Sequence, residues 1–218
     1  MTDDPRTLAI EGIRFFGEMS ASISHEIKNV FAIVNENAGL LADLVSMSAR
    51  GMPLSTERLE GLAQSMARQV SRGDRIVKGM NRFAHSADHP EEIVDVGETI
   101  QFITDLAARL IAMRGPAPYI ESPPAPVRLE TNRFFLENLI WNCLRRIMDA
   151  RVSDQDQPIS IRIEAGASGA RIIFRAPPGT PHHDNEAFPT PREEAVSRLL
   201  GARLTVDDAN TEITLIIP

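Results

Sequence analysis

Apolar residues recur at intervals of three and four along the first fifty residues of the chain. This spacing is typical of a helix with one buried face, and residues 6 to 50 include no proline that would break it. Gly51 and Pro53 end the pattern, because glycine favours a helix C-terminus and proline cannot continue a helix. The same spacing returns between residues 59 and 84, which predicts two long helices joined by a short turn. The expected buried positions are Met19, Ile23, Ile27, Val30, Val34, Ala38, Leu41 and Val45 in the first helix, and Leu59, Leu62, Met66, Val70, Gly73, Val77, Met80 and Ala84 in the second.

A single antiparallel hairpin would leave half of each apolar stripe in water. Two copies of the hairpin can bury both stripes in a dimeric four-helix bundle, which is the arrangement we expect. The alternative is that the hairpin packs against the C-terminal part of its own chain.

The helical pattern breaks near residues 86–90, and a mixed pattern of strands and helices follows. We therefore expect a hairpin domain at residues 1–90 and a second domain at residues 91–218. The predicted elements of the second domain are strands at 93–96, 159–165, 170–176, 203–206 and 212–217, helices at 96–114, 132–151 and 191–200, and a short edge strand at 119–120 within a proline-rich segment. This order predicts an α+β protein whose second domain is a small α/β sandwich.

His25 lies away from the expected buried face of the first helix. It is two residues beyond Ile23 and therefore about 200° round the helix from it. A histidine that filled the core would lie on the apolar stripe, so we expect His25 to point into solvent or toward a partner. Ser22, Lys28 and Asn29, three or four residues away, share its side of the helix, and Glu26 flanks it.

The composition excludes several classes of function. A net charge of −7 argues against a dedicated nucleic-acid binder and against attraction to anionic membranes. The N-terminus lacks the pattern of a signal peptide and no run approaches 18 apolar residues, so we expect a cytoplasmic protein without a membrane span. The single cysteine, Cys143, excludes an intramolecular disulfide. No cluster of histidine and cysteine predicts a metal site.

The segment His25-Glu26-Ile27-Lys28-Asn29 resembles the phosphoacceptor motif of the sensor histidine kinases of two-component systems. Further segments similar to that family follow in the same order, so that the likeness runs from about residue 12 to the end of the chain. These segments are the helical hairpin, residues 94–98, residues 138–142 and the terminal residues 201–206 and 211–218. The resemblance implies a second domain similar to the kinase ATPase domain.

Kinases of this family bind ATP through three elements, of which this sequence keeps one. Asn138 and Asn142 match a pair of asparagines on one helix, the second of which helps to hold Mg²⁺; they could equally be polar residues on a helix flank. Arg175 stands where the resemblance places an aspartate that accepts a hydrogen bond from adenine, and a guanidinium has only donors. Residues 180–190, which correspond to a glycine-rich lid, contain no glycine. The resemblance therefore implies a vestigial site and no bound cofactor.

A phosphoacceptor histidine joined to such a domain is similar to the histidine phosphotransferases built on a degenerate kinase architecture, of the ChpT type and the sporulation type. In these relays a phosphoryl group passes from an aspartyl phosphate on one receiver domain to the histidine, and then to an aspartate on a second receiver. The implied partners are response-regulator receivers and, upstream, a hybrid histidine kinase. Neutral imidazole is a competent nucleophile, and Mg²⁺ would be supplied with the receiver.

The residues beside His25 have candidate roles in this chemistry. Glu26 could orient the imidazole or accept a proton, and Lys28 could offset the charge of the phosphoryl group. Asn29 occupies the position at which an amide in related kinases orients a water, so Glu26-x-x-Asn29 also resembles a receiver-phosphatase motif. Two alternatives to phosphotransfer remain: a non-catalytic regulator that binds receivers or kinases, and an ATP-dependent kinase.

Overall fold

The computed structural model describes residues 5–149, 157–166, 169–178, 187–207 and 211–218. The chain divides into two compact units, one of residues 20–82 and one that combines residues 1–19 with residues 83–218. The N-terminal stretch thus groups with the α/β part of the chain, whereas the sequence predicted a boundary near residue 90.

The unit of residues 20–82 is a helical hairpin. It is formed by α1 (Pro5–Ala49), which begins in the other unit, and α2 (Thr56–His85), as the apolar spacing predicts. Gly51 adopts a φ of 87° at the turn, a left-handed conformation that glycine tolerates best. The Ser55 hydroxyl accepts a hydrogen bond from the backbone N–H of Arg58 at 3.3 Å and so caps the start of α2.

The two helices meet along one line of buried residues. Val30 is 4% exposed, and a Cβ added to Gly73 of α2 would lie 3.4 Å from its Cγ1. Further along, Asn37 donates a hydrogen bond to the Ser65 hydroxyl at 3.0 Å. Gly73 therefore allows close approach of the helices in the middle of the hairpin.

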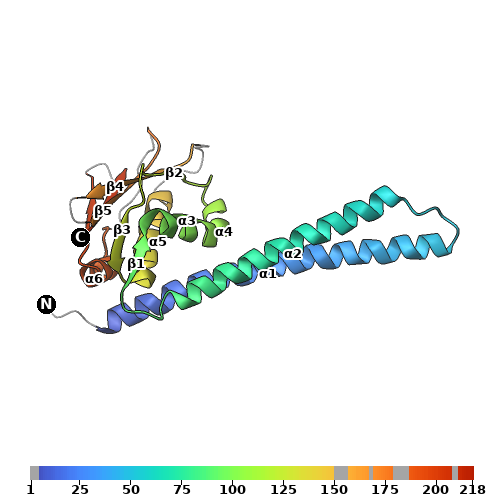
Figure 1. The fold of residues 1–218 in the computed structure, drawn as a ribbon, viewed down its shortest axis with the longest axis horizontal. Coiled ribbons are helices and arrows are strands. Elements are labelled where there is room, and N and C mark those ends of the chain that lie inside the picture. The colour runs from blue at the N-terminus through green and yellow to red at the C-terminus, as the bar shows by residue number, and fades with distance from the viewer. Residues whose placement is uncertain (1–4, 150–156, 167–168, 179–186, 208–210) are drawn as a thin grey trace. The chain divides into compact units, whose positions relative to one another are not determined.

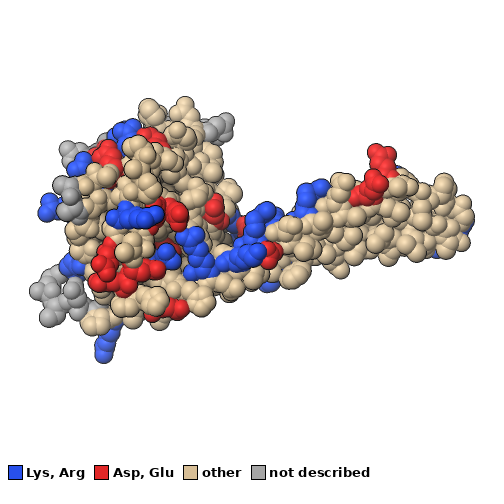
Figure 2. Space-filling view, viewed as in Figure 1, with Lys and Arg blue, Asp and Glu red and all other residues tan. Residues whose placement is uncertain are grey.

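Part of the predicted buried stripe is exposed in the single chain. The side face of the hairpin consists of Val45, Val70 and Val77 of that stripe, which are 57%, 63% and 46% exposed, and of Phe31, which was not predicted to be buried and is 67% exposed. Phe31 lies about 100° round α1 from Val30, and Val70 about 60° round α2 from Gly73 in the same rotational sense. Because the helices are antiparallel, both offsets point to the same side of the hairpin. One helix pair can bury only its own contact line, so this side face remains in water. On the face that Figure 2 shows, charged side chains are few in the part of the hairpin near its loop.

The α/β unit contains a five-stranded sheet in the order β2-β4-β5-β7-β6 and a separate antiparallel pair, β1 and β3. In the large sheet only β2 and β4 are parallel. Helix α5 packs against β5 and β7, and α3 and α6 pack against α5 (Figure 1). The strands are β1 (Glu92–Asp95), β2 (Tyr119–Glu121), β3 (Arg128–Thr131), β4 (Ser160–Gly166), β5 (Gly169–Arg175), β6 (Arg203–Val206) and β7 (Glu212–Ile217); the helices are α3 (Val96–Leu106), α4 (Ala108–Ala112), α5 (Arg133–Asp149) and α6 (Pro191–Leu199).

The core of this unit forms where the sheet meets α5. Ile172 and Phe174 alternate with exposed residues along β5 and are fully buried, as the period of two requires. Leu139, Ile140 and Trp141 of α5 are all fully buried, although they cover more than one face of the helix. Helix α5 is buried on most sides because the sheet, α3 and the start of α1 surround it.

The start of α1 is part of this core. Phe15 is 2% exposed, and its ring centroid lies 5.3 Å from those of both Phe83 and Phe134. A Cβ added to Gly12 would lie 3.4 Å from the Phe134 ring, so glycine at this position lets α1 approach α5 closely. This packing explains why residues 1–19 group with the α/β unit.

Three details differ from the sequence expectation or lie beyond the described residues. The helix predicted at 96–114 is divided at Ala107 into α3 and α4, whose last residue is Ala112. Strand β3 was not predicted, because its four residues alternate Arg, Leu, Glu and Thr and are too short to give a clear pattern. Most of the predicted lid segment, residues 180–186, lies outside the described residues.

Helix α1 has properties that matter for the prediction that the chain has no membrane span. It is long and apolar enough to span a membrane by length and composition, with a mean hydropathy of 1.3 over its most apolar window, of which 11% is buried. The expectation is therefore not confirmed. Val30 on the contact line and Phe31 and Val45 on the side face contribute to the apolar composition of α1.

Candidate functional site

His25 lies near the middle of α1 and is exposed. It is about 140° round the helix from buried Val30, in the rotational sense opposite to that of Phe31. The imidazole therefore faces away from both the contact line and the side face of the hairpin. A second protein can reach it without displacing any element of the hairpin.

Glu26 points toward α2, where it forms an ion pair with Arg72. The guanidinium Nη2 lies 2.9 Å from Oε2 of Glu26, and the two side chains are 41% and 21% exposed. The sequence did not reveal Arg72, because a cross-helix partner depends on the register between α1 and α2. The pair holds Glu26 at the edge of the helix contact, one residue from His25, and offsets its negative charge.

Lys28 and Asn29 are both exposed on the side of α1 that carries His25. Asn29 is one turn beyond His25 and about 40° round the helix from it, and Lys28 is about 60° round in the other direction. The structure thus brings together His25, Lys28 and Asn29 on one surface, with Glu26 beside them. The prediction for Ser22 is wrong, because its side chain is 2% exposed and lies next to buried Ile23 in the hairpin.

The predicted asparagine pair lies on α5 and is buried, Asn138 at 0% and Asn142 at 3% exposure. The Asn142 amide donates to Oδ1 of Asn138 at 3.1 Å and to the Glu11 carboxylate at 3.3 Å. Its oxygen accepts from Arg145 at 3.0 Å. Both amide hydrogens of Asn142 are therefore engaged within the chain.

A second carboxylate of α1 reaches the same face of α5. Glu18 accepts hydrogen bonds from Arg145 at 3.2 Å and from the indole N–H of Trp141 at 3.1 Å. This contact was not predicted from the sequence. The only signal was the seven-residue spacing of Glu11 and Glu18, which places both carboxylates on one face of α1.

Arg175 ends β5 and forms a cross-strand pair with Glu212 of β7. Its Nε donates to Oε2 of Glu212 at 2.8 Å. The two residues are register partners in the antiparallel sheet. The position that the resemblance assigns to an adenine-binding aspartate thus carries a guanidinium that is already bound.

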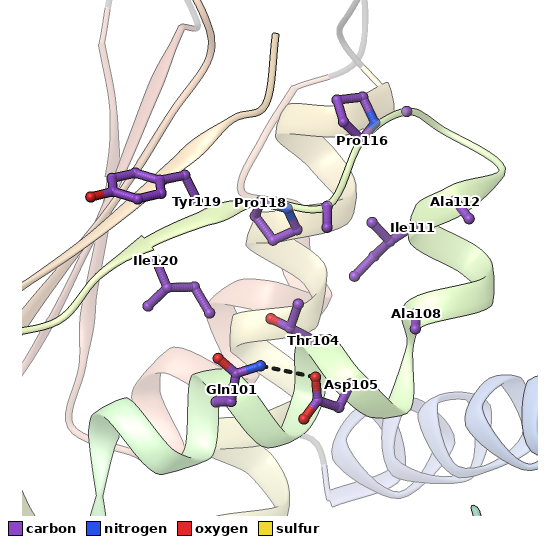
Figure 3. Close-up of a pocket in the computed structure, with 12 residues that line it drawn as sticks. Gln101, Thr104, Asp105, Ala108, Ile111, Ala112, Pro116, Pro118, Tyr119 and Ile120 are labelled. Atoms are coloured by element: carbon purple, nitrogen blue, oxygen red, sulfur yellow. Dashed lines mark hydrogen bonds between the residues drawn. The ribbon is translucent and has the colours of Figure 1, made fainter. Parts of the chain in front are cut away.

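Two other features of the α/β unit lack the groups that phosphoryl transfer needs. An open groove of about 540 Å³ between α3, α4 and β2 is lined by prolines and small apolar residues, and its one carboxylate, Asp105, accepts a hydrogen bond from Gln101 at 2.9 Å (Figure 3). Burial raises the pKa of the Cys143 thiol well above its usual range, and the charge of Glu193 adds to this effect. Among the described residues, no group of three or more histidine, cysteine, aspartate or glutamate side chains could hold a metal ion.

No model of a known protein family matches the sequence. The C4-dicarboxylate transport sensor protein DctB of Rhizobium meliloti is 25% identical over 201 residues, which cover 89% of this chain and 30% of that protein. The chain therefore spans less than a third of the length of the curated relative that it matches.

Solved structures that align with this chain include two histidine kinases and a phosphotransferase. The histidine kinase AdeS of Acinetobacter baumannii aligns over 88% of this chain and 96% of its own, with 10% identity and a TM-score of 0.47. A bacterial phosphotransferase aligns over 93% of this chain and 95% of its own, with 14% identity and a TM-score of 0.47. Histidine kinase ThkA in complex with the response regulator TrrA aligns over 94% of this chain and 62% of its own, with 14% identity and a TM-score of 0.46. The chain itself consists of a long helical hairpin and a small α/β domain.

Proposed function

We propose that this protein is a histidine phosphotransferase that relays a phosphoryl group between receiver aspartates through His25. The observation that carries the proposal is the exposure of His25 on a hairpin face that is used neither for the helix contact nor for the side face. Lys28 and Asn29 lie on the same surface, and Glu26 is beside it.

The state of the α/β unit favours transfer between proteins over autophosphorylation. Arg175 has only donors, and its partner is Glu212. Asn142 is bonded to Glu11, and the neighbouring Arg145 to Glu18. The groups that would recognise adenine and phosphates are therefore replaced or occupied, and we propose that the chain binds no nucleotide.

Transfer requires one bond to form and one to break at phosphorus. A ring nitrogen of His25 donates its lone pair to phosphorus, while the bond from phosphorus to the aspartyl oxygen of the receiver breaks and the aspartate leaves as a carboxylate. The second receiver reverses these steps with its own aspartate. Mg²⁺ would be bound by the carboxylates of the receiver. On this chain, Lys28 offsets the charge of the transferring group, and Arg72 lowers the repulsion from Glu26.

Two copies of the chain complete the proposed architecture. The side face of Phe31, Val45, Val70 and Val77 is an apolar strip on both helices, which a second hairpin can cover in a four-helix bundle. His25 lies on the other side of α1 and would stay accessible in such a dimer.

A phosphoryl-transfer assay tests the proposal. Receiver domains from the same organism are phosphorylated with a labelled small-molecule donor, freed of the donor and mixed with the protein. We expect acid-labile, base-stable label on the wild type and none on His25→Ala. His85→Ala removes another exposed histidine and should retain full labelling. Equal labelling of wild type and His25→Ala would overturn the proposal.

The same assay separates the alternative functions. A non-catalytic regulator would bind receivers, yet no label would appear on it from any of them. A phosphatase would release inorganic phosphate from the receiver without label on His25, and Asn29→Ala would stop the release. An ATP-dependent kinase would become labelled from γ-labelled ATP without a receiver.

A further inference from the structure

The open groove between α3, α4 and β2 has an apolar floor. Ile111 and Pro118 line the groove and are buried, and Ile120 points into it from β2 (Figure 3). Thr104 is the polar residue beside them, and its hydroxyl donates a hydrogen bond to the Ile100 carbonyl at 2.8 Å. Because this hydroxyl is engaged, the floor of the groove favours an apolar side chain of an occupant over a polar one.

The groove is open because α4 presents small side chains to it. Ala108 and Ala112 lie one turn apart on α4, line the groove and are exposed. Pro116 and Pro118 form the wall between α4 and β2. Proline restricts the backbone and has no N–H group, so this wall offers few donors to an added β-strand. The groove therefore suits the side chains of an occupant better than pairing with its backbone.

The wall that α3 contributes is acidic. Asp105 lines the groove, and Glu98 lies two turns earlier on the same face of α3. Both residues are exposed, and neither forms an ion pair with a cation among the described residues. A helix C-terminus is itself partly negative, and the last turn of α3 contains Asp105 and no basic residue. The negative charge at this end of α3 is therefore uncompensated within the helix and attracts a cation.

We infer that this groove is a docking site for a basic, apolar segment of a partner protein. An apolar side chain of the segment fills the space beside Ala108 and Ala112. Its lysine or arginine side chains reach Asp105 and Glu98, which are about 10 Å apart along α3, the spacing of residues three apart in an extended segment. Charge complementarity selects this class of occupant, because the same wall repels an acidic segment. The inference does not depend on phosphoryl transfer through His25.

Peptide selection followed by affinity measurement tests the inference. A display library of random short peptides is selected on the immobilised full chain, and an enriched peptide is labelled for fluorescence anisotropy. We expect enriched peptides to combine basic residues with an apolar one. The variant A108L/A112L fills the groove and should lower their affinity about tenfold or more.

A matched pair of charge variants tests the acidic wall. Asp105→Asn keeps an oxygen that can accept from Gln101, and it should weaken peptide binding about two- to fivefold, as for an exposed ion pair. The difference should shrink at high salt. Glu130→Gln makes the same change in charge at an exposed position of β3 and should bind as the wild type does.

Four outcomes would overturn the inference. The library yields no enriched peptide, or the enriched peptides bind A108L/A112L as tightly as the wild type. They lack basic residues and bind Asp105→Asn without loss. Alternatively, light scattering shows that A108L/A112L dissociates a dimer, which would make a second copy of the chain the occupant.

A folding control keeps the test decisive. Urea unfolding followed by Trp141 fluorescence shows whether each variant is folded. If A108L/A112L is not, E98Q/D105N gives the comparison instead, because both changes lie at exposed positions and should together lower peptide affinity about tenfold. Label on His25 is not measured in these experiments, so failure of this inference is distinct from failure of the proposed relay.

Discussion

The packing of Phe15 provides a direct test of how the chain divides into units. If residues 1–19 are part of the α/β core, Phe15→Ala should destabilise that unit, although residue 15 lies in the long helix of the hairpin. If the division lay at residue 90, the loss would fall on the hairpin and leave the α/β unit unchanged.

The expected size of the effect follows from the burial of Phe15. Its side chain is 2% exposed and contacts the rings of Phe83 and Phe134. Truncation of a buried phenylalanine to alanine costs about 3–5 kcal/mol in lost transfer free energy and cavity formation. With a urea m-value of about 2 kcal/mol/M, the unfolding midpoint should fall by about 2 M.

Urea unfolding followed by tryptophan fluorescence measures this change selectively. Trp141 is fully buried in α5, so its emission reports on the α/β unit and not on the hairpin. Ile13→Ala is the control, because Ile13 lies on the same helix two residues away and is 73% exposed. Its free energy of unfolding should stay within about 0.5 kcal/mol of the wild type. A Phe15→Ala midpoint that moves no further than the Ile13→Ala midpoint would refute the assignment of residues 1–19 to the core.

Two other predictions concern assembly and pH. Val70→Glu places a charge on the side face of the hairpin and should convert a dimer into monomers in light scattering, whereas Glu60→Gln should not; a dimer that survives Val70→Glu would contradict the use of this face. Because burial raises the pKa of the Cys143 thiol, the thiol stays protonated in the folded chain and ionises above pH about 8.5 only after unfolding. The contribution of Cys143 to the free energy of unfolding is therefore fully present below that pH and is lost as the pH rises. The unfolding free energy should fall by up to about 1.4 kcal/mol per pH unit between pH 9 and 10, and this slope should be absent from Cys143→Ala; equal slopes in the two proteins would show that Cys143 does not contribute.

Most elements of the fold could be predicted from local patterns. The spacing of apolar residues indicated α1 and α2, and alternation indicated β4, β5, β6 and β7. The exposed position of His25 followed from its angle to Ile23 on one helix. Such predictions succeed because each depends only on residues within a few turns or along a single strand.

The contacts between distant segments were not predictable in the same way. Arg72 is 46 residues from Glu26, and Glu18 is 127 residues from Arg145. These pairs depend on the register of two helices and on how the start of α1 packs against α5. A helical wheel or a pattern of alternating residues shows neither the register of two helices nor how α1 packs against α5.

The sequence by itself determined that a long amphipathic hairpin would present His25 on its polar side and that a mixed α/β segment would follow. Only the tertiary structure decided that the first turns of the same helix belong to the core of the α/β unit, with Phe15 buried and Glu11 and Glu18 bound to α5. The reason is physical. A helical pattern shows which face of α1 is apolar, but the hydrogen-bond partners of Glu11 and Glu18 lie more than a hundred positions away and are brought to α1 by packing. The structure therefore adds to the predicted phosphoacceptor surface a set of polar contacts between the start of α1 and α5.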